Sequence, residues 1–223
     1  MACMVPFCDN PRASQHQHRN RRQQQHSNYR GDLNLRANSG DDVPESENTN
    51  LWITNLPNSI THRRFLSAIH NVGRVRSLVI HNSGSRRGTA AAALSFFRRP
   101  ASELFKSQCD RRLIQFDGRV PRVVWNRHKV EQTNEGVLSR VLLIAGDPEI
   151  VNRRCLDEFF ATRFTYDIDR IIPHGTVETE TGPVARFEYR FGSWRGQAVL
   201  GFYAIQNELY GRVLTEYGMD PCS

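Results

Sequence analysis

"RRGTAAAALSFF", residues 86–97, is the stretch that decides the fold. Its four consecutive alanines favour a helix, because alanine has the highest helix propensity of all residues. The stretch is short, however, with a glycine before the alanines and a proline shortly after its end. In a strand, Ala92 and Phe96 would share one face and Ala91 and Ala93 the other, because side chains alternate. We predict a strand because tertiary context overrides local propensity.

The segments around this stretch give the order strand, helix, strand, strand, helix, strand. Strands are predicted at 50–57, at 74–82 and after the turn within 114–130, from alternation and β-branched content. Helices are predicted at 59–73 and 98–113, from an N-cap residue, an apolar stripe and an early proline. The same order returns over residues 139–219, so the chain carries two copies of one unit of about 80 residues.

The predicted fold class is therefore α+β. Two ferredoxin-like domains each place a four-stranded antiparallel sheet against two helices. The first domain spans residues 49–130 and the second spans residues 139–223, and residues 131–138 form a polar linker. Residues 1–48 lack periodicity and apolar content, so we predict a disordered low-complexity tail.

The first domain is strongly basic. Residues 49–130 carry fifteen Arg and Lys against three acidic residues, a net charge of +12. Residues 1–48 are neutral overall and residues 131–223 carry −5, which gives the +7 of the whole chain. A segment this basic attracts polyanions by counterion release and steering. Only Lys106 and Lys129 are lysines. Arginine suits phosphate contacts and base stacking, although a genomic bias toward arginine gives the same composition.

Other classes of function find little support. Five scattered cysteines without a Cys-x-x-Cys pair indicate free thiols in a reducing, intracellular compartment, nuclear or cytoplasmic. No apolar run is long enough for a transmembrane helix, and the first residues lack the features of a secretion signal. No catalytic or metal-ligand spacing stands out, so we expect no enzyme, no metal and no cofactor.

The first domain resembles the RNA-recognition motif (RRM) family. "LWITNLP", residues 51–57, is similar to the family's first-strand hexamer, and residues 86–97 stand where its third-strand octamer belongs. "FDGRVPRVVW", residues 116–125, is similar to the family's Asp-Gly-Arg turn into the fourth strand. The whole layout, with a degenerate second copy, resembles filamentous-fungal RRM proteins. The resemblance implies that single-stranded RNA binds on the outer face of the sheet.

In this resemblance, Ala91 and Ala93 take the places of the family's two stacking aromatics. Trp52 keeps the aromatic position of the hexamer beside the two alanines, which leaves a shallow shelf for one base. The alternative is that Trp52 is covered by the chain after the fourth strand or by the second domain. Trp125 shares the parity of Val123 and is predicted to be structural.

Basic side chains are predicted to border this shelf and to hold phosphates while Trp52 stacks. His81, on the second strand, is interpreted as an ordinary surface histidine. The predicted RNA-binding residues are Trp52, Thr54, Asn55, Arg76, Arg86, Arg87, Ala91, Ala93, Arg122, Arg127 and Lys129.

The second domain departs from the family pattern. Its hexamer equivalent "LLIAGD", residues 142–147, has leucine at the position of Trp52. Its third strand is predicted to turn Arg186, Glu188 and Arg190 outward. An acidic domain repels phosphates, so a protein partner is the predicted ligand of residues 139–223, although a solvent-facing charge ladder without a partner fits equally. For the whole chain, the alternative is a protein–protein interaction module that uses RRM-like folds without binding RNA.

Overall fold

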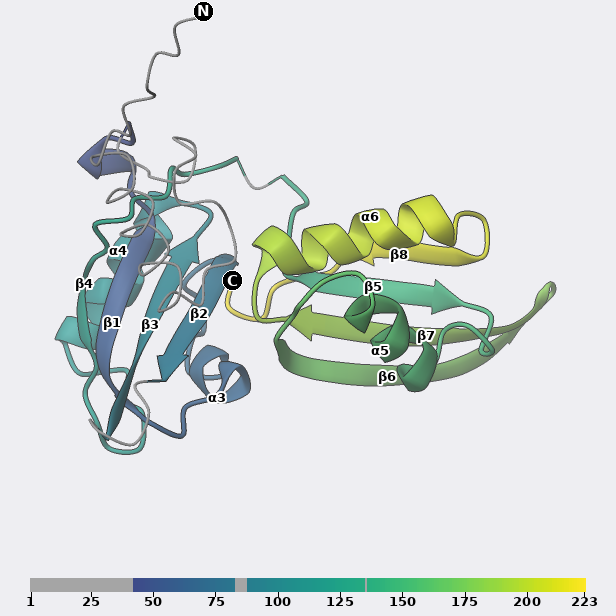
Figure 1. The fold of residues 1–223 in the computed structure, drawn as a ribbon, viewed down its shortest axis with the longest axis horizontal. Coiled ribbons are helices and arrows are strands. Elements are labelled where there is room, and N and C mark those ends of the chain that lie inside the picture. Colours follow the sequence, from purple (N-terminus) through teal and green to yellow (C-terminus); the bar gives the residue numbers. More distant parts are fainter. Residues whose placement is uncertain (1–41, 83–87, 135) are drawn as a thin grey trace, which may run out of the picture. The chain divides into compact units, whose positions relative to one another are not determined.

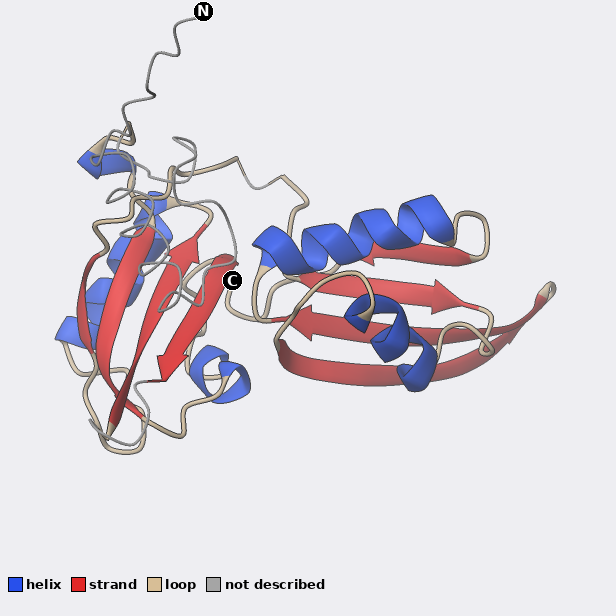
Figure 2. Cartoon of the chain, in the orientation of Figure 1, coloured by secondary structure: helices blue, strands red, loops and turns tan. Residues whose placement is uncertain are grey.

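The computed structural model describes residues 42–82, 88–134 and 136–223, and these fall in one compact unit. They form two domains, each built on one sheet (Figures 1 and 2). The predicted disordered tail lies outside the described residues as far as residue 41, while residues 45–47 form a short 3-10 helix. Within the described ranges, no helix combines the length and the apolar character needed to cross a membrane.

The first domain has the predicted order of elements. After η1(Glu45–Glu47) come β1(Asn50–Pro57), α3(His62–Leu66), β2(Val75–Asn82), β3(Thr89–Phe96), α4(Arg99–Asp110) and β4(Arg122–Trp125). The strands pair antiparallel in the order β2-β3-β1-β4, as Figure 1 shows. This is the strand order of a βαββαβ unit, so the predicted fold of this half is confirmed.

Strand β3 alternates as predicted. Ala92, Leu94 and Phe96 are completely buried, whereas Ala91 and Ala93 are only half-buried. The buried residues of β3 join one apolar core with side chains of β1, β2 and both helices. The alanines of this stretch therefore form a strand because its alternate residues fill a core, which outweighs their helix propensity.

The first helix is shorter than the sequence predicts. Thr61 caps α3 by accepting a hydrogen bond from the Arg64 amide at 3.2 Å, but the helix ends at Leu66 instead of near Gly73. The backbone amides of Val72 and Gly73 donate instead to the Cys222 carbonyl, at 2.9 and 3.0 Å. A contact with a residue far along the chain thus replaces the last helical turns.

The second domain repeats the order of the first. Its elements are β5(Val141–Gly146), α5(Arg153–Ala161), β6(Ile168–Thr179), β7(Gly182–Phe191), η3(Trp194–Ala198), α6(Val199–Glu208) and β8(Val213–Tyr217). The strand order is β6-β7-β5-β8, which matches the first sheet position by position. The predicted single helix after β7 is interrupted, because Arg195 and Gly196 have non-helical backbone angles.

The last residues of the chain pack into the first domain. The Cys222 side chain is completely buried within the apolar core of that domain, and its thiol contacts the Leu66 carbonyl at 3.7 Å. Burial raises the pKa of the Cys222 thiol to about 12, so the thiol stays protonated. The segment after β8 is therefore part of the first domain's structure as well as of the second's.

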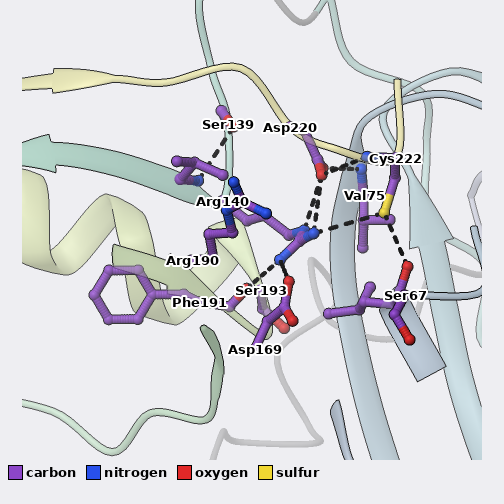
Figure 3. Close-up of polar contacts among 12 residues, drawn as sticks. Ser67, Val75, Ser139, Arg140, Asp169, Arg190, Phe191, Ser193, Asp220 and Cys222 are labelled. Atoms are coloured by element: carbon purple, nitrogen blue, oxygen red, sulfur yellow. Dashed lines mark hydrogen bonds and ion pairs between the residues drawn. The ribbon is translucent and has the colours of Figure 1, made fainter. Parts of the chain in front are cut away.

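Arg140 holds this segment in place (Figure 3). Its buried guanidinium donates to Asp220 Oδ1 at 3.1 Å, to Asp169 Oδ2 at 2.9 Å and to the Phe191 carbonyl at 3.0 Å. Burial acts to lower the pKa of Arg140, but the two carboxylates outweigh it and raise the pKa above its ordinary value. Two buried carboxylates thus depend on one cation.

The alternation of β3 can be tested with two matched substitutions. Ala92→Leu should lower the free energy of unfolding by about 1–3 kcal/mol, because the added atoms overpack a filled core. Ala93→Leu adds the same atoms on the outer face, where the Trp52 indole can move toward solvent, so it should lower the free energy of unfolding by less than Ala92→Leu does. Urea denaturation of both variants measures the difference, and equal losses would contradict the assigned faces.

The Arg140 network gives a second stability prediction. Arg140→Met should cost about 3–5 kcal/mol, because it leaves the buried carboxylates of Asp169 and Asp220 without their cation. The control is Arg163→Met, which removes an ion pair with Glu208 at the surface of the same domain and should cost about 1 kcal/mol or less. Thermal and urea unfolding of the full chain compare the two, and similar costs would refute the importance of the network.

Candidate nucleic-acid interface

Trp52 lies at the centre of the outer face of the first sheet. Ala93 on β3 and Val124 on β4 stand directly opposite it on either side, and Val79 on β2 stands opposite Ala93. Trp52 is half-buried, while Val79 is 43% and Val124 41% exposed. The four side chains form one apolar row that crosses all four strands and is open to solvent.

The indole of Trp52 meets the imidazole of His81, which stands two strands away. The ring centroids are 5.3 Å apart with an interplanar angle of 48°. His81 is paired with Ala91, and Ala93 lies opposite Trp52, so only methyl groups stand on the intervening strand. The alanines therefore leave the indole room to lean across β3 toward β2.

The sequence interpretation of His81 as an ordinary surface histidine missed its contact with Trp52. Its alternation with Val79 along β2 places both on the outer face, and this was the available signal. The contact with Trp52 depends on the small residues between them, which sequence spacing alone does not measure. Burial lowers the pKa of His81 below its ordinary value.

The predicted basic residues divide into two groups. The side chains of Arg122, opposite Thr54, and of Arg127 are exposed and make no hydrogen bond or ion pair with any residue that the structure describes. Arg76 donates to the Glu131 carbonyl at 2.6 Å, and Lys129 pairs with Glu45 at 3.2 Å. Burial, followed by the nearby Arg195, lowers the pKa of Arg76. Arg86 and Arg87 lie outside the described residues.

Asn55 occupies a structural position. Its backbone is left-handed, with φ of 64°, at a bulge that interrupts the pairing of β1 with β3. Asparagine tolerates this conformation better than most residues. Its side-chain amide donates to the Val120 carbonyl at 2.9 Å, which ties the end of β1 to the turn before β4.

Trp125 faces away from the Trp52 row. Trp125 packs against the core, and the guanidinium of Arg99 lies 3.4 Å from the centre of its ring. After β4, the amide of Asn126 donates to the Asn50 carbonyl at 2.9 Å, so the chain continues beside the start of β1. This agrees with a structural role for Trp125.

The outer face of the second sheet has a different character. Leu143 stands where Trp52 stands in the first sheet, and it is paired with Glu188 and with Glu216. Glu188 is nearly buried, 3.0 Å from the imidazole of His174, and it accepts a hydrogen bond from Arg190. The outward positions of its central strands carry no aromatic residue in the described chain, so this face has no stacking surface there.

Metal binding has no support in the described part of the chain. No group of three or more His, Cys, Asp or Glu side chains gathers there in a way that would hold an ion. The chemistry available on the outer face of the first sheet is therefore aromatic stacking, apolar contact and attraction of anions.

The Trp52–His81 contact predicts a measurable titration. The pKa of His81 should lie below 6.5 in the intact chain, and Trp52→Ala should raise it toward 6.5 because the indole no longer covers the ring. Since the folded pKa is depressed, the neutral ring stabilises the fold above pH 6.5, and this stabilisation is lost as pH falls through the folded pKa. A histidine-selective NMR titration measures both values. A pKa of 6.5 or above in the intact chain would contradict the contact.

Comparisons with known proteins return similar structures only. No family model and no curated protein matches the chain. The chain is similar to RNA recognition domains 1 and 2 of Sex-lethal from Drosophila melanogaster, at 16% identity and a TM-score of 0.30, over 77% of this chain and 100% of that one. It is also similar to the first two RRM domains of the yeast poly(U) binding protein Pub1, at 15% identity and a TM-score of 0.32, over 76% and 99%. The RNA binding domain of Hrp1, solved in complex with RNA, matches at 14% identity and a TM-score of 0.27, over 77% and 97%. With identities and TM-scores this low, the likeness assigns no function to this chain.

Proposed function

We propose that this chain binds single-stranded RNA on the outer face of its first sheet. The observation that carries the proposal is the half-exposed indole of Trp52 in an open apolar row, within a segment of net charge +12. Aromatic rings on which bases stack, bordered by cations, are the usual means of holding a single strand. A duplex offers no unstacked base to such a face, so the proposed ligand is single-stranded RNA.

In this proposal one base stacks on the open side of the Trp52 indole, which leans over Ala91 and Ala93 toward His81. Arg122, opposite Thr54, and Arg127, beyond the other end of β4, hold phosphates on either side of the indole, and Thr54 offers a hydrogen-bonding group beside Arg122. Each stacked base contributes about 1–3 kcal/mol, so the two aromatics that alanine replaces cost on the order of 100-fold in affinity. Binding is therefore modest, dominated by phosphate contacts and weakly dependent on sequence.

The other predicted residues serve the face more indirectly. Asn55, Arg76 and Lys129 each make a contact within the chain. In this proposal they set the shape and the charge at the border of the RNA face and do not bind RNA directly. Arg86 and Arg87 remain predicted phosphate contacts. The second domain, residues 139–223, acts as a scaffold, which its buried contacts with the first domain support, and it is also the proposed site of a protein partner.

Substitution of two tryptophans tests the proposal. In the full chain, Trp52→Ala should weaken binding of a short single-stranded oligouridylate by about 5- to 150-fold, because one stacked base is lost. Trp125→Ala should weaken it far less, because that ring packs under Arg99 against the core. Fluorescence anisotropy measures the affinity, and circular dichroism checks that both variants fold. Equal affinities in both folded variants would show that the site is misplaced.

The salt dependence of RNA affinity distinguishes the proposal from its alternative, a protein-interaction module that does not bind RNA. Phosphate contacts release counterions, so affinity for the oligouridylate should fall steeply as salt concentration rises. The full chain is required for this titration, since Cys222 belongs to the core of the first domain. An absence of binding even at low salt would favour the protein-interaction alternative.

A further inference from the structure

We infer that the second domain sets the geometry of the proposed RNA face by clamping β2, the strand that carries Val79 and His81. The clamp consists of Ser193, Asp220 and Arg140, all from outside the first sheet. The effect of the clamp on RNA binding rests on the proposed function. The effect of the clamp on β2 does not depend on that function. It assigns a positioning role to residues that do not touch the RNA face.

Ser193 satisfies both backbone groups of one residue on the free edge of β2. Its hydroxyl accepts a hydrogen bond from the Leu78 amide at 3.0 Å and donates to the Leu78 carbonyl at 3.3 Å. A hydroxyl has one donor and two acceptor sites, so it can make both bonds at once. Strand β2 is an edge strand, and no strand of its own sheet pairs with this side of it.

The position of Ser193 is itself fixed. Ser193 is only 3% exposed, and its amide donates to the side chain of Gln197 at 3.1 Å. Its neighbour Gly192 packs so closely on His62 of α3 that an added Cβ would lie 2.7 Å from the imidazole Cδ2. A side chain at position 192 would therefore have to displace the His62 ring, which packs beside Ser193.

Asp220 makes the second contact with β2. Its Oδ2 accepts a hydrogen bond from the Val75 amide at 2.8 Å, across 145 residues of sequence. Its Oδ1 is bound by Arg140, so the two oxygens of one fully buried carboxylate join the domains, as Figure 3 shows. Arg140 thus orients Asp220, and Asp220 holds the first residue of the strand.

These two anchors lie next to the face residues of β2. Leu78 directly precedes Val79, which stands opposite Ala93, and His81 stands opposite Ala91. A shift of β2 would therefore change the distance between the His81 and Trp52 rings, which meet across β3. The indole on which the base is proposed to stack thus meets β2 through His81.

Substitutions in the full chain test the clamp. Ser193→Ala should speed hydrogen exchange at the Leu78 amide by about three- to tenfold, because this amide loses its acceptor. Asp220→Asn should speed exchange at the Val75 amide by a similar factor, because a neutral amide oxygen is a weaker acceptor than the carboxylate. Both should shift the NMR resonance of His81, and both should weaken oligouridylate binding by about three- to tenfold. Ser193→Thr, which keeps the hydroxyl, should restore the behaviour of the intact chain.

The matched control is Arg163→Gln. It removes an ion pair from the surface of the second domain without touching the first, so it should leave exchange at β2, the His81 resonance and RNA affinity unchanged. Ser193→Ala removes a single oxygen, which keeps the test valid if Asp220→Asn fails to fold.

The outcomes separate this inference from the proposed function. If the intact chain binds RNA and a folded Ser193→Ala variant binds it equally well with an unshifted His81, the clamp is refuted. If the intact chain binds no RNA, the proposed function is refuted, and the His81 resonance then decides the clamp alone. A shifted resonance supports the clamp, and an unshifted one overturns it.

Discussion

The alternation of side chains along β3 is the constraint on which the first domain depends. Its inward residues fill the core. Its outward residues, Ala91 and Ala93, have the smallest side chains that any residue except glycine can offer. Because they are small, Trp52 can lean across the sheet to His81. The same alternation thus stabilises the fold and leaves the Trp52 indole partly exposed on this face.

The second domain has the same topology as the first but differs from it in the residues on its outer sheet face and in the packing of its last segment. Its central strands carry charged and aliphatic residues outward, whereas its last segment enters the core of the first domain. Buried carboxylates are costly unless a cation compensates them, and Arg140 compensates both Asp169 and Asp220. Such a buried network requires precise geometry, so the chain after β8 is held in one position relative to β2.

The period of two in the strands made much of this predictable from sequence. It indicated the strands and which residues share a face. The outward positions of Trp52, Ala91 and Ala93 followed from the resemblance to the RRM motifs, and the order of elements followed from the succession of strand and helix signals. The loss of the predicted helix as far as Gly73 was not predictable, because the amides of Val72 and Gly73 donate to the Cys222 carbonyl, far along the chain. The Trp52–His81 contact was missed for a related reason: it depends on register across three strands.

The most direct measurement is a map of NMR chemical-shift changes in the isotope-labelled full chain as oligouridylate is added. Stacking on Trp52 predicts the largest changes at outward residues of the first sheet, namely Val79, Ala91, Ala93 and Val124, with small changes at Ala92 and Leu94 beneath them. Changes confined to the second sheet or to helices α3 and α4, with the Trp52 row unaffected, would contradict RNA binding at this face.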